Sequence, residues 1–167
     1  HVDAAGNTGS ITRTVNVTVP DLTAPVVSLS GSATVNIEYN TVYVDDGAEW
    51  TDNVDGSGNT LDATFILSGM VNTGALGSYT LEYIKTDAAG NTGSVSRTVN
   101  VVDTTAPVVS LVGLATETVF SGSVYVDSGA TWIDAVDGTG TVVAFNSGFL
   151  DMNNTGTYTI IYMHVDA

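Results

Sequence analysis

Aspartate carries most of the potential chemistry of this chain, and its copies recur at matching places of an internal repeat. The sequence DAAGNTGS begins at Asp3 and again at Asp87, and a further copy starts at Asp166. Carboxylate and amide oxygens are ligands for hard cations such as calcium. The repeated acidic positions are therefore candidates for metal binding. Further equivalent pairs are Asp21 with Asp103, Asp45 with Asp127, Asp52 with Asp134, and Asp55 with Asp137.

The repeat also predicts the domain organisation that would position these residues. Residues 24–56 align without gaps on residues 106–138, and both segments contain the sequence APVVSL and one tryptophan. Such duplication is typical of a tandem array. We predict that residues 1–20 are the last strand of a preceding repeat, that 21–102 form a complete first repeat, and that 103–167 form a second repeat lacking its last strand. The linkers are short and contain proline, so neighbouring repeats should be held close together.

The local pattern predicts strands. Residues 95–101 alternate between a face of valine and arginine and a face of polar side chains, and turn signals containing glycine recur along the chain. This pattern is typical of an all-β antiparallel sandwich. Trp50 and Trp132 lie in such strands and are expected to fill the cores. A Gly-x-Tyr sequence at Tyr79 and Tyr158 predicts a tyrosine corner in each repeat.

These motifs together resemble a known family. Their order is similar to that of the immunoglobulin-like (Ig-like) repeat of bacterial surface proteins, which is related to hyalin repeats. The motifs are, in chain order, APVVSL, Tyr-x-Asp-x-Gly-Ala, Asp-x-Val-Asp-Gly, Gly-x-Tyr-x-x-x-Tyr, DAAGN and Arg-Thr-Val-x-Val. The resemblance implies seven-stranded sandwiches arranged end to end, in secreted or cell-surface adhesins. It implies no particular ligand.

An immunoglobulin-like strand order would gather the acidic loops at the linkers. With seven strands, the loop 52–56 and the turn 87–91 return to the end of the domain where the linker enters. Our hypothesis is that each joint holds one structural calcium ion, because clustered carboxylates repel one another until a cation joins them. The expected ligands are Asp21, Asp52, Asp55, Asp87 and Asn91 at the first joint, and Asp103, Asp134, Asp137 and Asp166 at the second.

A simpler interpretation stands beside the metal hypothesis. Asp-Gly and Gly-Asn sequences form turns, and an aspartate can cap its own turn without any ion. The calcium loop of helix-loop-helix proteins does not fit, because with Gly56 at its sixth position the first ligand position is Thr51.

The few basic residues have distinct expected roles. Arg97 and its counterpart Arg13 lie on strand faces rich in valine, where an unpaired guanidinium would cost several kcal/mol. We therefore expect each to pair with the carboxylate of a loop aspartate. Lys85 and His164 occupy the same position of the repeat, so we expect no strict chemical requirement there. We expect both histidines to be ordinary strand positions.

Composition excludes several classes of function. The chain has 3 Lys plus Arg against 18 Asp plus Glu, for a formal net charge of −15. Such a negative field repels nucleic acids and anionic membranes, and no apolar run could cross a bilayer. Cysteine is absent, and no serine or threonine is placed beside a base, so the chain is not expected to be an enzyme.

Three functions remain open from the sequence. The first is an extender module of a bacterial adhesin or extracellular fibre, at the cell surface or outside the cell, whose partners are neighbouring repeats of the same chain. The second is a filament subunit that forms a homopolymer, in which residues 1–20 of one copy complete the open sandwich of another. The third is a carbohydrate- or ice-binding module.

Overall fold

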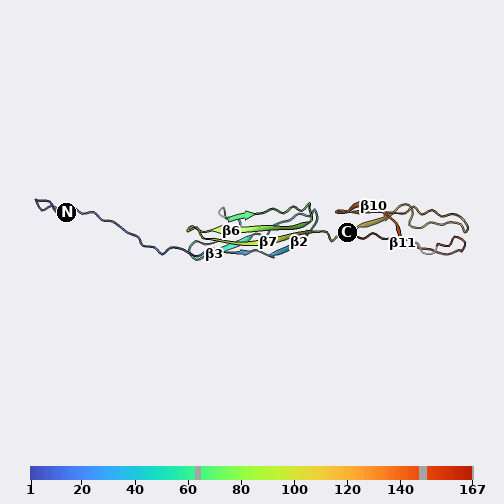
Figure 1. The fold of residues 1–167 in the computed structure, drawn as a ribbon, viewed down its shortest axis with the longest axis horizontal. Coiled ribbons are helices and arrows are strands. Elements are labelled where there is room, and N and C mark those ends of the chain that lie inside the picture. Colours follow the sequence, from blue (N-terminus) through green and yellow to red (C-terminus); the bar gives the residue numbers. More distant parts are fainter. Residues whose placement is uncertain (63–64, 147–149, 167) are drawn as a thin grey trace. The chain divides into compact units, whose positions relative to one another are not determined.

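The computed structural model describes residues 1–62, 65–146 and 150–166, and within them it contains strands and no helix. None of these residues therefore belongs to a helix that is long and apolar enough to cross a membrane. The strands are β1 (Val26–Leu29), β2 (Thr34–Glu38), β3 (Ala48–Asp52), β4 (Gly56–Asn59), β5 (Phe65–Ser68), β6 (Gly77–Thr86), β7 (Thr92–Val102), β8 (Val108–Leu111), β9 (Ala130–Asp134), β10 (Gly138–Val142), β11 (Ala144–Asn146) and β12 (Ile161–Tyr162) (Figure 1).

Contacts divide the chain into two compact units. Unit 1 contains His1–Ser30, Gly47–Leu67 and Tyr83–Val95, and unit 2 contains Gly31–Asp46, Ser68–Glu82 and Ser96–Ala167. The long strands β6 and β7 pass from one unit into the other. The predicted all-β class is confirmed.

The first repeat forms two sheets. One has the order β1-β3-β4, and the other has the order β2-β7-β6-β5. In contrast to the antiparallel arrangement expected from the sequence, β2 and β7 are parallel, with Thr34 opposite Thr98 and Ile37 opposite Val101. A parallel pair needs a long connection, and most of the repeat lies between these two strands. No local turn signal could therefore have predicted their direction.

The second repeat reproduces the first sheet. Strands β8, β9 and β10 form a sheet of order β10-β9-β8, and β11 pairs with β12. Val108 lies opposite Ile133, as Val26 lies opposite Thr51 in the first repeat. Residues that align in the two sequences therefore pair in the same register in both sheets.

Each tryptophan covers a glycine on the neighbouring strand. Trp50 lies opposite Gly58 and Trp132 lies opposite Gly140. A Cβ atom added at these glycines would lie 2.7 Å from Trp50 Nε1 and 2.6 Å from Trp132 Nε1, so the indole rings require the absence of a side chain. Trp50 is buried, as predicted, whereas Trp132 is only half-buried.

Both predicted tyrosine corners are confirmed. The hydroxyl of Tyr79 donates to the carbonyl of Ala75 at 2.9 Å, and the hydroxyl of Tyr158 donates to the carbonyl of Asn154 at 3.1 Å. In each case the acceptor lies four residues upstream. The corner therefore forms from a local sequence signal in both repeats.

Arg97 is completely buried and forms the predicted ion pair. Its guanidinium contacts the carboxylate of Asp45, and its Nε donates to the carbonyl of Ser32 at 3.0 Å. Its counterpart Arg13 is exposed and forms no ion pair with any described residue. Residues 9–19 belong to no sheet.

Lys85 has a defined chemical role, although the sequence predicts no strict requirement at its position. Its ammonium is buried, lies 3.3 Å from a carboxylate oxygen of Asp62, and lies 4.0 Å from the ring centroid of Trp50. A cation above an indole face is attracted by the ring electrons. In the second repeat His164 stacks on Trp132 with ring centroids 3.9 Å apart. The shared position therefore covers the tryptophan in both repeats, which corrects the expectation from sequence.

Replacing Arg97 with alanine should lower the free energy of unfolding by about 3 kcal/mol or more, because removing one member of a buried ion pair leaves the other without compensation. Urea unfolding of the whole chain measures this loss. Arg13→Ala is the matched control, since that arginine is exposed and should leave stability unchanged. Equal stability of the two variants would contradict the structural role of the buried pair.

Candidate metal centres

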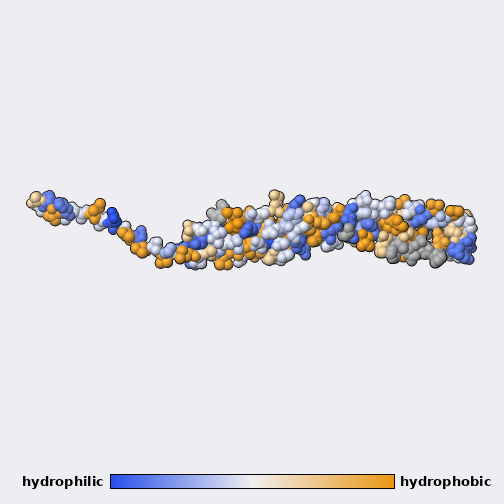
Figure 2. Space-filling model, in the orientation of Figure 1, coloured by the Kyte–Doolittle hydropathy of each residue, from blue (hydrophilic) through white to orange (hydrophobic). Residues whose placement is uncertain are grey.

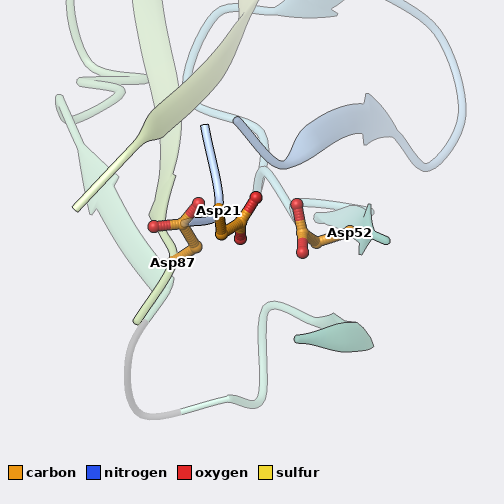
Figure 3. A group of neighbouring side chains, drawn as sticks. All are labelled: Asp21, Asp52 and Asp87. Atoms are coloured by element: carbon orange, nitrogen blue, oxygen red, sulfur yellow. The ribbon is translucent and has the colours of Figure 1, made fainter. Parts of the chain in front are cut away.

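Three predicted ligands of the first joint come together in unit 1. Asp21 lies in the linker, Asp52 ends β3, and Asp87 lies between β6 and β7. One carboxylate oxygen from each lies within 4.8 Å of the others, and Figure 3 shows the three side chains side by side. We call this group the Asp21 cluster. Segments distant in sequence therefore converge on one acidic site.

The turns use one oxygen of each carboxylate and leave the other. Asp52 Oδ1 accepts hydrogen bonds from the backbone N–H groups of Val54 and Asp55, and Asp21 Oδ1 accepts one from Thr23. The Oδ2 atoms of Asp21 and Asp52 are buried and have no hydrogen-bond partner among the described residues. Buried polar atoms are normally paired. Turn capping therefore explains the positions of the two Oδ1 atoms and gives no role to the two Oδ2 atoms.

Asp87 is held by a turn that forms without help from its surroundings. Asn91 donates to Asp87 from its backbone N–H at 2.7 Å and from its side chain at 2.8 Å. The exposed copy at Asp3 makes the equivalent bonds with Asn7, at 2.8 and 2.9 Å. Burial raises the pKa of Asp87, but these hydrogen bonds outweigh it, so its pKa lies below the usual 3.8. The cassette therefore presents an ionised carboxylate.

Of the other two predicted ligands of the first joint, Asp55 is not among the three clustered carboxylates, and Asn91 contacts two members of the cluster. Asp55 is exposed, and its Oδ2 accepts a hydrogen bond from the N–H of Ala88 at 3.0 Å. The side-chain amide of Asn91 donates to the carbonyls of Asp21 and Thr23, at 3.3 Å each. These two residues therefore fix the linker and the two loops relative to one another.

Unit 2 contains the equivalent group of the second joint. Asp103, Asp134 and Asp166 each bring one carboxylate oxygen within 4.8 Å of the others, and we call them the Asp103 cluster. Asp134 Oδ1 caps the N–H groups of Val136 and Asp137, as Asp52 does in the first repeat. Asp166 Oδ1 is buried without a hydrogen-bond partner among the described residues. The fourth predicted ligand, Asp137, is exposed and interacts with the Asp166 carboxylate.

The electrostatics of the Asp103 cluster are unfavourable without a cation. Burial, followed by the charges of Asp134, Asp103 and Asp137, raises the pKa of Asp166. Burial and the charge of Asp134 also raise the pKa of Asp103, against a hydrogen bond from Thr105. Backbone hydrogen bonds keep the pKa of Asp134 low. The ion pairs of the described residues involve no member of either cluster.

Glu38 is a site residue that sequence reasoning missed. Its carboxylate accepts hydrogen bonds from the hydroxyls of Thr104 at 2.7 Å and Thr105 at 2.8 Å, and from the N–H of Thr104. The Thr104 and Thr105 bonds lower its pKa from 4.5 to about 2. The equivalent residue of the second repeat is Phe120, so the repeat pattern gave no signal. Glu38 therefore ties the end of β2 to the second linker.

The spacing of the oxygens fits a calcium ion. Calcium binds oxygen ligands at about 2.3 to 2.6 Å, so two ligands of one ion are at most about 5 Å apart. The oxygens of each cluster lie within 4.8 Å of one another. Each cluster therefore offers three carboxylates within the span of one calcium ion.

The raised pKa of Asp166 predicts an effect of pH that calcium reverses. Below the usual pKa of 3.8, the Asp166 carboxyl is protonated in both the folded and the unfolded protein. As the pH rises through the higher pKa of the folded state, Asp166 ionises at a cost that the unfolded chain does not have, so the folded state loses stability. In chelator at neutral pH, Asp166→Asn should therefore melt at a higher temperature than the wild type, and the difference should vanish near pH 3.8. In excess calcium the variant should melt lower. If Asp166→Asn melted below the wild type in chelator as well, this result would contradict repulsion between Asp166 and the neighbouring carboxylates.

Comparisons with known proteins address the first repeat. Residues 27–101 match the family described as bacterial surface protein, Ig-like domain. The comparison with curated proteins gives no significant match. A crystal structure of a lipoprotein from Bacteroides thetaiotaomicron is similar at 21% identity and a TM-score of 0.41, and the alignment covers 52% of this chain and 45%, less than half, of that one. The segment from Val27 to Val101 is therefore similar to the bacterial surface protein Ig-like domain.

Proposed function

We propose that this chain is an extender segment of a bacterial adhesin or fibre at the cell surface, in which calcium ions fix the linkers between Ig-like repeats. The observation that carries the proposal is the pair of equivalent acidic clusters. Each combines one linker aspartate with two loop aspartates of the repeat that follows. The Asp21 cluster contains two buried carboxylate oxygens without a hydrogen-bond partner among the described residues, and the Asp103 cluster contains one. The family match to a bacterial surface domain supports the cellular location.

The second linker is held from both sides within unit 2. Glu38, at the end of β2 in the first repeat, binds Thr104 and Thr105. The preceding residue, Asp103, belongs to the cluster formed with Asp134 and Asp166 of the second repeat. A cation in this cluster would neutralise the repulsion among its carboxylates and restrict the linker. Calcium would thus convert a short hinge into a fixed connection.

Extension and attachment need no reactive centre, which agrees with the poor catalytic inventory of the sequence. A weak calcium affinity is sufficient outside cells, since extracellular modules bind calcium at about 10⁻⁴ to 10⁻³ M. The linkers would then be held where calcium is plentiful. Before secretion, where calcium is scarce, the joints would stay loose.

Calorimetric titration of the whole chain with calcium should detect two sites. Asp87→Asn should remove one site by taking a charged ligand from the Asp21 cluster. Asp3→Asn is the matched control, because Asp3 makes the same turn bonds in an exposed copy that belongs to neither cluster. Calcium binding that is absent, or equally reduced by both substitutions, would contradict the proposal.

Spin labels should report the stiffening of the second linker. The chain has no cysteine, so labels can be attached at Ser57→Cys and Thr139→Cys, two exposed and equivalent positions of the repeats. Calcium should narrow the distribution of distances between the labels in electron paramagnetic resonance, and Asp134→Asn should abolish the narrowing. An equally broad distribution with calcium and with chelator would rule out a role in stiffness while leaving calcium binding intact.

A further inference from the structure

The second linker begins beside a residue of the sheet that precedes it. Glu38 is the last residue of β2 and lies opposite Val102, the last residue of β7. Asp103 follows Val102 directly and belongs to the Asp103 cluster. The pairing continues one residue further, because the N–H of Tyr39 donates to the carbonyl of Val102 at 2.8 Å. Glu38 is therefore carried on a paired strand, next to the point where the linker leaves the sheet.

Glu38 and Asp103 bind consecutive N–H groups of the linker. Both oxygens of Glu38 accept the N–H of Thr104, at 3.1 and 3.2 Å. Asp103 Oδ1 accepts the N–H of the next residue, Thr105, at 3.2 Å. Because the two N–H groups point to different carboxylates, a rotation of the linker backbone between them breaks at least one of these bonds. The two carboxylates together therefore fix the conformation of the linker.

Two hydroxyl groups add to this hold. The hydroxyl of Thr104 donates to one oxygen of Glu38 at 2.7 Å, and the hydroxyl of Thr105 donates to the other at 2.8 Å. Hydrogen bonds to a carboxylate are stronger than those between neutral groups. Both threonines are exposed, and small patches of hydrophobic and hydrophilic residues alternate along the visible face of the molecule (Figure 2). The linker is thus held at Glu38 by polar contacts, which we call the Glu38 clamp.

The clamp depends on residues that differ between the repeats. Leu22 occupies the position of Thr104 in the first linker, and Phe120 occupies the position of Glu38 in the second repeat. Neither a leucine nor a phenylalanine side chain can donate or accept a hydrogen bond. The clamp is therefore a property of these particular residues and not of the repeat as a whole.

The charge of Glu38 also acts on the Asp103 cluster. Burial raises the pKa of Asp103, and the charges of Asp134 and Glu38 raise it further, against the hydrogen bond from Thr105. Glu38 thus adds a negative charge to those of the cluster. Repulsion among these carboxylates favours movement of the linker, and the bonds of the Glu38 clamp oppose that movement.

We propose that Glu38 is a positioning residue of the second joint, which holds the linker through Thr104 and Thr105 and thereby keeps Asp103 in its cluster. The clamp restricts the linker without calcium. It also raises the calcium affinity of the Asp103 cluster, because a linker that is already ordered loses less conformational freedom on binding. This effect on affinity rests on the proposed function. The residue at this position of the repeat, glutamate or phenylalanine, would then set how firmly the following linker is held.

Spin-label distances in chelator test the hold on the linker without calcium. The labels are again at Ser57→Cys and Thr139→Cys. Combining Thr104→Val with Thr105→Val removes both hydroxyl bonds but keeps the charge of Glu38. This valine variant should give a broader distribution of distances than the wild type. Serine at both positions keeps the hydroxyls and should restore the wild-type distribution. A valine variant with an unchanged distribution would overturn the proposal.

Calorimetry tests the effect on calcium affinity. All chains carry Asp87→Asn, so that the titration reports the Asp103 cluster alone. The valine variant should bind calcium at least about fivefold more weakly, the low end of typical coupling between sites. The serine variant should bind like the parent chain. Thr23→Val is the matched control, because Thr23 corresponds to Thr105 and its exposed hydroxyl has no hydrogen-bond partner among the described residues.

Glu38→Ala separates positioning from charge. It removes the clamp and the negative charge, so it should weaken calcium binding at least as much as the valine variant does. If Glu38→Ala weakened binding and the valine variant did not, Glu38 would act by charge alone and the positioning role would be overturned. Equal affinity in all variants would overturn the inference and leave the proposed function intact. A wild-type chain that binds no calcium would contradict the proposed function and the effect on affinity, but not the hold measured in chelator.

Discussion

The hydrogen bond from a backbone N–H group to an aspartate carboxylate is the interaction on which the candidate site depends. It shapes the turns at Asp52, Asp87 and Asp134, and because each turn uses a defined oxygen, it also fixes where the rest of the carboxylate lies. Such local bonds form in any context, as the exposed copy at Asp3 demonstrates. The turn and the metal interpretations are therefore not exclusive. The turn places the carboxylate, and its remaining oxygens are available to a cation.

Basic residues are too scarce in this chain to neutralise the clustered carboxylates. Lys85 and Arg97, two of the three Lys and Arg residues, are buried and paired with Asp62 and Asp45. Because both cations are held by these partners, neither pairs with a carboxylate of the Asp21 or Asp103 cluster. Carboxylates that converge at a linker thus meet no side-chain cation among the described residues. Protons or metal ions from solution would relieve this repulsion, so we expect the linkers to respond to ionic conditions.

Sequence reasoning was reliable where the signal was local or duplicated. The tyrosine corners, the burial of Trp50 and the partner of Arg97 follow from a short motif or from the cost of burying a charge. It failed where the outcome depended on packing between distant segments. The parallel pairing of β2 with β7 has no local signal, and the role of Lys85 above Trp50 is hidden because histidine replaces lysine in the second repeat. Glu38 has no acidic counterpart there, so duplication could not identify it.

The two repeats share one sheet and differ in the segments around it. The sheet of β8, β9 and β10 forms with the same register as its counterpart of β1, β3 and β4. Residues 116–120, which are equivalent to β2, form no strand, and Tyr162 is half-buried where its counterpart Tyr83 is fully buried. Pairing within the first sheet is therefore separable from the ordering of the second. The first sheet is held by strands close in sequence, whereas β2 pairs with β7, a strand from the far end of the repeat.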